Sequence, residues 1–236
     1  MARSPQTLIP TTPQTRFRGC PYSHIWCYPQ MWVCGNVVRM STTIGIVQSK
    51  GGVGKTTTAI YLGLALKDRG TVEIWDADPQ GSATEWADAT AAAGYPLPFP
   101  VTAVNEPQLS KKDSEASYLI IDTGPGNPRV MDKTIERADV VIIPTKSSSV
   151  DMARTWSTLD ALPEDQPAIL LMTQTDPRTI THRQTIEAID QDGAAYFQTP
   201  IKHKESIKGS GNGYPSDLAG YEEVATELIE RIKEMS

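Results

Sequence analysis

The feature that most constrains this chain is a glycine-rich segment, residues 48–58, which lies between an apolar run and a helix-forming run. The apolar run, residues 44–47, predicts a buried strand, and residues 59–67 predict a helix. Three glycines in four positions let the backbone turn tightly and point its N–H groups at an anion, and the helix N-terminus adds a positive dipole. The segment therefore predicts a phosphate-binding loop at the end of a strand.

Two side chains complete the predicted phosphate site. Lys55 is expected to reach the β- and γ-phosphates of a nucleotide, and the Thr56 hydroxyl is expected to ligate Mg²⁺. The common phosphate-loop pattern has glycine at the position of Ser49, and here a second lysine, Lys50, stands beside that position. The alternative is an ordinary structural turn, which does not require this many matching positions between a strand and a helix.

Residues 50–57, with the pattern K-G-G-x-G-K-T-T, resemble the deviant Walker A box of the ParA/MinD family of ATPases. The resemblance implies ATP and Mg²⁺ as cofactors and a homodimer that sandwiches ATP, in which Lys50 reaches the nucleotide of the partner subunit. It implies catalytic roles for Lys50, Lys55 and Asp78. The nucleotide contacts that it implies are Lys50, Gly51, Gly52, Val53, Gly54, Lys55, Thr56, Thr57 and Asp122, of which Thr56 and Asp122 would hold the metal.

Two predicted strands run directly into carboxylates. Residues 71–75 lead into Asp76 and Asp78, and the apolar residues 118–121 lead into Asp122. Ligands of open α/β sheets gather at the carboxyl ends of the strands, where these aspartates lie. In the resembled family the later aspartate of D-x-D-P-Q positions the attacking water, which here is Asp78, and Asp76 lies nearer the metal. Asp122 completes a Walker B pattern and is expected to hold Mg²⁺ through a water. The alternative is that aspartates merely end strands and cap turns.

Strands alternate with helices along the rest of the chain, which predicts an α/β fold with a mostly parallel twisted sheet and helices on both faces. With the resemblance, this is a P-loop NTPase of the deviant Walker A type. The turn at residues 123–125 resembles the γ-phosphate-sensing switch of the family. The further elements predicted are helices at 57–68, 83–93, 127–137, 151–162, 181–190 and 218–235, strands at 101–104, 138–144 and 168–173, and a polar connection at 106–117.

Three loops carry functional hypotheses, and two of them have a structural alternative. Residues 144–151 resemble a loop that lies at the dimer face of ParA relatives, or form a solvated loop that caps the next helix. Residues 174–178 occupy the position where relatives contact the base, without the asparagine or arginine often found there. Lys202, Lys204 and Lys208 form the most basic patch of the body and predict sequence-independent DNA binding, or a solvated lysine-rich loop.

Charge divides the chain into two parts. The net charge is −6, but residues 1–39 hold four arginines and no acid, so residues 40–236 carry 18 basic and 28 acidic side chains. Any DNA contact must therefore come from a local patch. All three cysteines lie within residues 1–39, at spacings that match no common zinc pattern. We expect residues 1–39 to be a disordered or non-native extension, with a transit peptide as a lesser option, and residues 40–236 to be a ParA-like ATPase domain.

Together with these features, the resemblance implies an ATP-dependent dimerising switch for plasmid or chromosome partition, of the small type without an N-terminal helix-turn-helix domain. The resemblance implies non-specific DNA binding in the ATP state and slow hydrolysis that a ParB-like or other centromere-binding partner stimulates. The expected location is the cytoplasm, on the nucleoid, with no membrane partner. One alternative is a MinD-like membrane-cycling regulator, which the acidic last helix disfavours. The other is a P-loop small-molecule enzyme.

Overall fold

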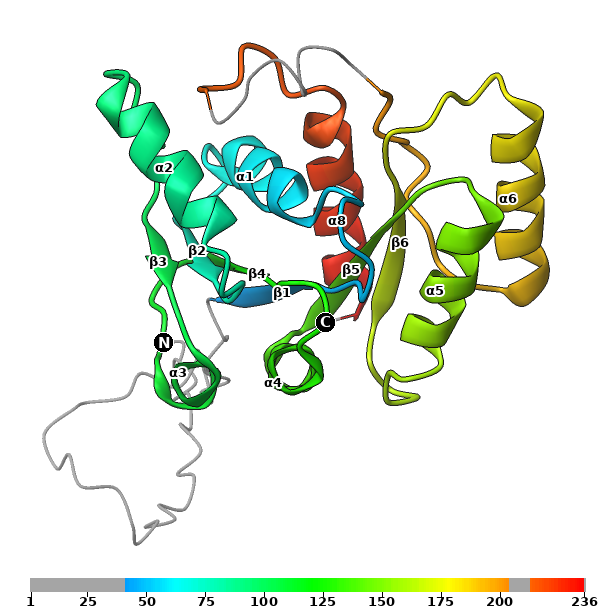
Figure 1. Cartoon of the computed structure of the whole chain (residues 1–236), viewed down its shortest axis with the longest axis horizontal. Coiled ribbons are helices and arrows are strands. Elements are labelled where there is room, and N and C mark those ends of the chain that lie inside the picture. Colours follow the sequence, from blue (N-terminus) through cyan, green and yellow to red (C-terminus); the bar gives the residue numbers. More distant parts are fainter. Residues whose placement is uncertain (1–40, 204–212, 236) are drawn as a thin grey trace, which may run out of the picture. The chain divides into compact units, whose positions relative to one another are not determined.

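The computed structural model describes residues 41–203 and 213–235, which are coloured in Figure 1. The predicted extension at residues 1–39 lies outside the described residues, as do Lys204 and Lys208 of the predicted basic patch. The separate character of that extension therefore stays a prediction.

Six strands form one sheet in the order β3-β2-β4-β1-β5-β6, and every pairing is parallel (Figure 1). The strands are β1 Thr42–Ile46, β2 Val72–Asp76, β3 Val101–Ala103, β4 Tyr118–Asp122, β5 Val140–Thr145 and β6 Ala168–Met172. Strands β4, β5 and β6 are nearly continuous apolar runs, as expected for a parallel sheet that is covered on both faces. The predicted fold class is confirmed.

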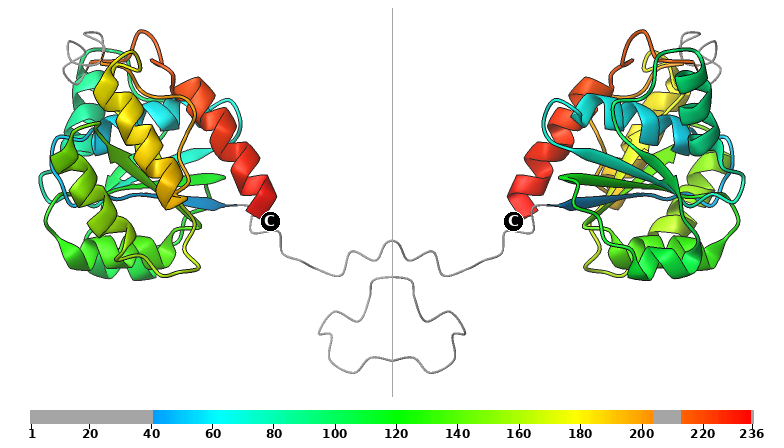
Figure 2. Two further views of the ribbon diagram at one scale, coloured as in Figure 1. Left: turned by 90° about the vertical axis from the view of Figure 1, so that its right-hand side faces the viewer. Right: turned by 90° about the vertical axis from the view of Figure 1, so that its left-hand side faces the viewer.

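Helices pack on both faces of this sheet, as the two side views in Figure 2 show. Helices α1, α2 and α8 cover one face, and α3, α4, α5 and α6 cover the other. Their bounds are α1 Lys55–Leu66, α2 Ser82–Ala92, α3 Glu106–Lys111, α4 Pro128–Arg137, α5 Ser149–Leu159, α6 Ile180–Asp192 and α8 Tyr221–Met235. Within the described residues, none of these helices combines the length and apolar character needed to cross a bilayer.

Successive side chains of a strand point to opposite faces, so each central strand contributes to two hydrophobic cores. On one face, Ile44 and Ile120 are fully buried in a cluster that includes α1 and α8. On the other face, Val141 and Ile143 pack with residues of α5 and α6. Burial on both sides fixes the positions of the strand ends, and these ends carry the polar residues described below.

The structure differs from the sequence prediction after β3. The polar connection predicted at 106–117 contains the short helix α3. Its start is fixed by a reciprocal capping box, in which Asn105 Oδ1 accepts from the Gln108 N–H at 3.1 Å and Gln108 Oε1 accepts from the Asn105 N–H at 2.8 Å. Helix α3 buries one apolar side chain, Leu109, against the sheet. The sequence has little apolar periodicity here, so the capping residues Asn105 and Gln108 were the feature from which helix α3 could have been predicted.

Candidate nucleotide-binding site

The carboxyl ends of three adjacent strands bring the predicted site residues together. In the parallel register, Ile46 at the end of β1 pairs with Asp122 at the end of β4, and Asp122 pairs with Asp76 at the end of β2. The glycine loop follows β1 and leads directly into α1. This edge is where open α/β sheets bind their ligands.

Two glycines of the loop have backbone angles that other residues rarely adopt. Gly52 has φ +73° and Gly54 has φ +93°, and Gly54 is also the N-cap of α1. An added Cβ at either position would meet no atom within 4 Å, so backbone conformation and not crowding requires glycine there. The N–H groups of the first turn of α1 have no partner within the helix, and the residues that carry them line the cavity described below.

Lys55 lies folded against its own loop. Its Nζ donates a hydrogen bond to the backbone carbonyl of Lys50 at 3.1 Å, and only 6% of the residue is exposed. Burial lowers the pKa of Lys55 below its ordinary value, and the charges of Asp122 and Asp78 oppose that shift. An ammonium group in this position is placed to bind the phosphates of a nucleotide in the same pocket.

Asp122 is fully buried, and among the described residues neither carboxylate oxygen has a hydrogen-bond partner. Burial raises its pKa to about 7, the carboxylates of Asp76 and Asp78 add to that rise, and the Thr56 hydroxyl and Lys55 oppose it. A buried carboxylate without a donor beside a threonine hydroxyl offers the oxygen ligands that Mg²⁺ prefers. The residues present therefore fit the metal ion that the loop implies.

Asp78 lies against the predicted switch turn. Its Oδ1 accepts a hydrogen bond from the Gln80 N–H at 2.9 Å. A Cβ added at Gly124 would lie 2.5 Å from the same Oδ1, so the turn packs directly on this carboxylate. The Thr123 hydroxyl donates to the Ile46 carbonyl at 2.7 Å and fixes the turn to the end of β1. The structure therefore brings together Asp78, the switch turn and the glycine loop.

Asp76 has partners away from the metal position. Its Oδ2 accepts from the Thr84 backbone N–H at 2.8 Å and from the Thr84 hydroxyl at 2.9 Å, and its Oδ1 accepts from the Asp78 N–H at 3.2 Å. The side chain is buried, with 1% of the residue exposed. These bonds connect β2 to the first turn of α2 and hold the segment that carries Asp78. Asp76 thus holds the segment of Asp78 in place, and its charge also raises the pKa of Asp122.

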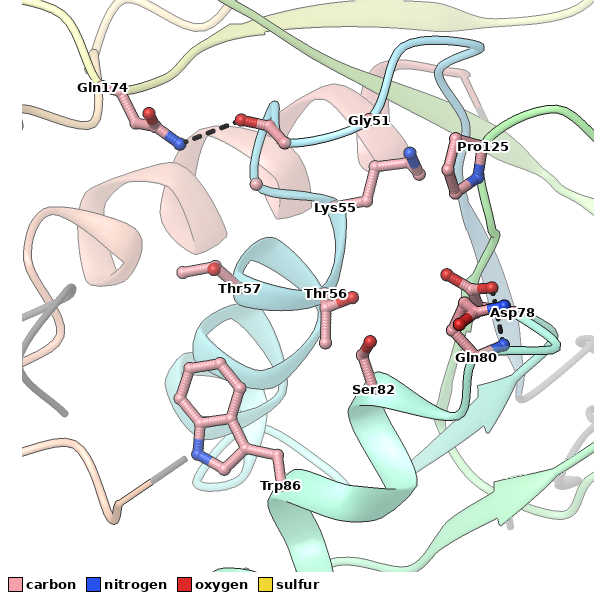
Figure 3. A pocket seen from close by; sticks show the side chains of 12 residues that line it. Gly51, Lys55, Thr56, Thr57, Asp78, Gln80, Ser82, Trp86, Pro125 and Gln174 are labelled. Carbon is pink, nitrogen blue, oxygen red and sulfur yellow. Dashed lines mark hydrogen bonds between the residues drawn. The ribbon is translucent and has the colours of Figure 1, made fainter. Parts of the chain in front are cut away.

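The loop forms one wall of a cavity of about 410 Å³ (Figure 3). Residues of four other segments complete the lining, among them Asp78 and Gln80 after β2, Trp86 on α2, Pro125 of the switch turn and Gln174 after β6. The volume is within the range of small-molecule sites, roughly 300–1,000 Å³. Sequence reasoning missed Trp86, which lies one helical turn beyond the D-x-D-P-Q segment.

Gln174 lies in the wall where the sequence analysis expected a base contact. Its Nε2 donates to the Gly52 carbonyl at 3.3 Å, as Figure 3 shows. Its φ of +50° is unusual for a residue with a side chain, and such angles are often found at functional sites. Its position is compatible with the predicted contact, which stays a prediction.

Four of the predicted residues that the structure describes lie outside the lining of this cavity, namely Lys50, Val53, Asp122 and Lys202. Lys50 forms an ion pair with Asp151 of α5. Lys202 lines a different cavity of about 560 Å³ together with Asp176, Arg178 and His203. Lys202 is exposed, and a bridge pairs it with Thr175 beside β6. The described part of the predicted basic patch is thus a surface feature near the strand ends, separate from the phosphate loop.

A parallel sheet whose central strand enters a glycine loop and a helix N-terminus, with a buried carboxylate on the next strand, defines a P-loop nucleotide-binding protein. Residues 44–214 match the model of the CobQ/CobB/MinD/ParA nucleotide-binding domain. The chain belongs to this family, which confirms the resemblance inferred from residues 50–57.

Relatives and solved structures of several kinds are similar to this chain. It is 34% identical over 203 residues to maintenance of carboxysome distribution protein A of Gloeobacter kilaueensis, covering 78% of this chain and 93% of the relative. A plasmid partition protein of Borrelia burgdorferi matches with a TM-score of 0.62 and 19% identity over 81% of this chain and 99% of that chain. Cobyrinic acid a,c-diamide synthase of Mycobacterium smegmatis, with bound ATP analogue and magnesium, has a TM-score of 0.62 and 21% identity, covering 83% and 97% of the chains. The two structures show a shared fold.

Proposed function

We propose that this chain is an ATP-dependent dimerising switch that partitions a plasmid or chromosome and binds DNA without sequence preference in its ATP state. The observation that carries the proposal is the different placement of the two loop lysines. Lys55 lies in the nucleotide cavity, whereas the Lys50 side chain points out of it toward α5. A second lysine directed away from its own cavity would reach the nucleotide of another subunit once it leaves its own ion pair with Asp151.

Different residues of the site are proposed to bind the phosphates, hold the metal ion and orient the attacking water. Loop N–H groups and the N-terminus of α1 bind the phosphates, and Lys55 exchanges the Lys50 carbonyl for the β- and γ-phosphate oxygens. Thr56 and Asp122 would hold Mg²⁺, which would supply positive charge to neutralise the phosphates. Asp78 orients the water that attacks the γ-phosphate, beside a switch turn that changes position when that phosphate leaves.

DNA binding is assigned to the surface near the ends of the strands. Lys202 is exposed there, and clustered positive charge is sufficient for contacts to the phosphate backbone. Lys204 and Lys208 belong to the proposed patch by sequence only. A dimer would present two such patches together, so ATP would strengthen the hold on DNA and hydrolysis would weaken it. This binding would place the protein on the nucleoid.

A partner protein is proposed to set the rate of hydrolysis, in the manner of a centromere-binding protein. The relative named for carboxysome distribution and the plasmid partition structure both carry names that describe the placement of a cargo. We commit to DNA as the cargo, and a different cargo is an outcome of the test. A gene for a small DNA-binding protein next to this one, beside repeated sequences, would support partition.

The test is dimerisation that depends on nucleotide. The whole chain should double its mass in light scattering when the non-hydrolysable analogue AMPPNP and Mg²⁺ are added. Lys55→Ala should remain a monomer because it loses phosphate binding, and Lys111→Ala, an exposed lysine on α3, should behave as the wild type. Asp78→Ala should dimerise with ATP and fail to hydrolyse it. A wild-type chain that stays monomeric with AMPPNP would contradict the proposal.

Two further measurements test DNA binding and domain organisation. Fluorescence anisotropy should show tighter binding to duplexes of unrelated sequence with AMPPNP than with ADP, and equal binding would remove DNA from the proposal. We also propose that residues 40–236 suffice for nucleotide binding. A protein that begins at Met40 should therefore bind AMPPNP as the full chain does, and a loss would assign a role to residues 1–39.

A further inference from the structure

The Lys50 ammonium is held by a carboxylate of its own subunit. Its Nζ contacts Asp151 Oδ1 at the start of α5, and the two side chains are 35% and 6% exposed. The residues are 101 positions apart in the sequence, so the fold alone brings them together. The pair lies outside the lining of the nucleotide cavity. Lys50 in this state is therefore not free to bind another charge.

Helix α5 keeps the Asp151 carboxylate in place and ionised. Asp151 lies in the first turn of α5, where the helix dipole favours negative charge. Ser148, the N-cap, accepts from the Asp151 N–H at 3.2 Å and donates its own hydroxyl hydrogen to the carboxylate. Burial acts to raise the pKa of Asp151, but hydrogen bonds from Lys50 and Ser148 and the charge of Lys146 outweigh it and lower the pKa. The carboxylate thus has support beyond Lys50.

The backbone of the loop is fixed to the same helix by a buried amide. Gln48 Oε1 accepts from the Lys50 N–H at 3.4 Å and from the Thr158 hydroxyl at 3.1 Å, and Gln48 Nε2 donates to the Thr155 hydroxyl at 3.2 Å. Gln48 is 1% exposed. These bonds hold the start of the loop on α5 while leaving the Lys50 side chain as the part that is able to move.

The charge of Asp151 distinguishes two states of Lys50, one paired with this carboxylate and one released from it. Beside Asp151 its positive charge is cancelled, and a triphosphate approaching from outside would meet a carboxylate as well as an ammonium. Strong attraction to the phosphates of a second copy requires the ammonium to leave Asp151. The carboxylate left behind keeps its hydrogen bond from Ser148 and its place at the helix N-terminus, so release is feasible.

We propose that Asp151 is a positioning residue that holds Lys50 on its own subunit and competes with the nucleotide of a second copy of this chain. The competition sets the protein concentration at which the ATP-bound form dimerises. The inference rests on the proposed function, because it requires dimerisation through a nucleotide. It adds that a carboxylate of the chain itself, Asp151, weakens dimerisation by binding Lys50.

The experiment measures the dissociation constant of the AMPPNP-bound dimer by analytical ultracentrifugation for four full-length variants. Asp151→Asn should dimerise about tenfold more tightly, since the wild-type dimer must break two part-buried ion pairs, one in each subunit, and together these remove on that order of competing affinity. Asp160→Asn removes the same charge at the other end of α5, where the side chain is exposed, and should leave the constant unchanged. Lys50→Gln should weaken the dimer, and adding Asp151→Asn to it should give no gain.

A second readout follows the pair without any dimer. Reductive methylation of nucleotide-free protein, followed by mass spectrometry, should label Lys50 slowly in the wild type and several-fold faster in Asp151→Asn. A circular dichroism spectrum that matches the wild type would show that Asp151→Asn is folded, so that the faster labelling reports release of Lys50 and not unfolding. Equal rates would overturn the inference, because the pair would then not hold the ammonium.

The outcomes separate two failures. If the wild type dimerises and Asp151→Asn dimerises equally or less tightly, the competition is wrong and the proposed function stands. A weaker dimer with Asp151→Asn would mean that the carboxylate presents Lys50 to the second copy. If the wild type does not dimerise with AMPPNP at all, the proposed function fails, and the inference fails with it because there is no competitor.

Discussion

Gly124→Ala offers a sharp test of how the site is assembled. The added Cβ would lie 2.5 Å from Asp78 Oδ1 and 2.7 Å from Asp78 Cγ, whereas non-bonded heavy atoms settle at about 3.5 Å. The carboxylate must therefore move by about 1 Å. Gly124 has no positive φ, so an alanine there meets a steric problem and not a backbone one.

The expected effect on catalysis is large and the effect on folding small. A misplacement of about 1 Å costs about 100-fold in rate, or about 2.7 kcal/mol of activation free energy. The carboxylate is the end of a side chain and is able to turn away, at the expense of the bond from the Gln80 N–H. That bond is worth about 1 kcal/mol, so the melting temperature should fall by about 2–4 °C.

Single-turnover hydrolysis and equilibrium binding of a fluorescent ATP analogue together form the assay. Gly124→Ala should reduce the hydrolysis rate about 100-fold and change nucleotide affinity by less than about threefold. On an Asp78→Ala background the same substitution should cost almost nothing further, because the displaced group is absent. A hydrolysis rate within twofold of the wild type, or an affinity loss as large as the rate loss, would refute this account of Asp78.

Three further predictions concern stability and DNA. Thr58→Val leaves the hydroxyl of buried Tyr221 without its 2.9 Å partner and should lower the unfolding free energy by about 1–3 kcal/mol, whereas Tyr221→Phe should cost less by chemical denaturation. Lys202→Glu should weaken DNA binding at low salt and reduce the salt dependence by about one unit, with Lys111→Glu as the unaffected control. Burial raises the pKa of Glu73, but hydrogen bonds from a lysine, a serine and an indole outweigh it and lower the pKa. A depressed carboxyl pKa gives stability that is present near neutral pH and lost as pH falls through the folded value. Unfolding free energies measured from pH 7 downward should therefore fall more for wild type than for Glu73→Gln.

The conformation of the glycine loop could be predicted from the sequence because it depends on the backbone angles of a few adjacent residues. Glycines at positions 52 and 54 are needed for positive φ, and a strand before them and a helix after them leave one arrangement of N–H groups. Asp122 was predictable for the same reason, since a buried apolar run ends in it. Features of this kind depend only on residues that are adjacent in the sequence, so they can be predicted without a structure.

Contacts between distant segments were not predictable. The pairing of Lys50 with Asp151 joins the glycine loop to a helix that begins nearly a hundred residues later. The sequence analysis gave two alternatives for residues 144–151, a loop at a dimer face and a solvated loop. It could not decide between them, because the sequence pattern around Asp151 does not show which cation this aspartate contacts. Trp86 was missed for a related reason, since an aromatic residue on an alanine-rich helix is more often a core residue than a cavity wall.

The way the loop is anchored indicates which parts of the site are able to move. Gln48 ties its start to α5, the Thr173 hydroxyl at the end of β6 donates to the Val53 carbonyl at 2.7 Å, and Gln174 donates to the Gly52 carbonyl. A loop fixed at three points, one against α5 and two against the segment after β6, changes its backbone conformation only at a high energetic cost when the nucleotide changes. In the proposed mechanism, loss of the γ-phosphate would therefore change the positions of side chains and of the switch turn rather than the backbone of the loop. In the proposed mechanism, Lys50 and the turn at Gly124 would carry that movement.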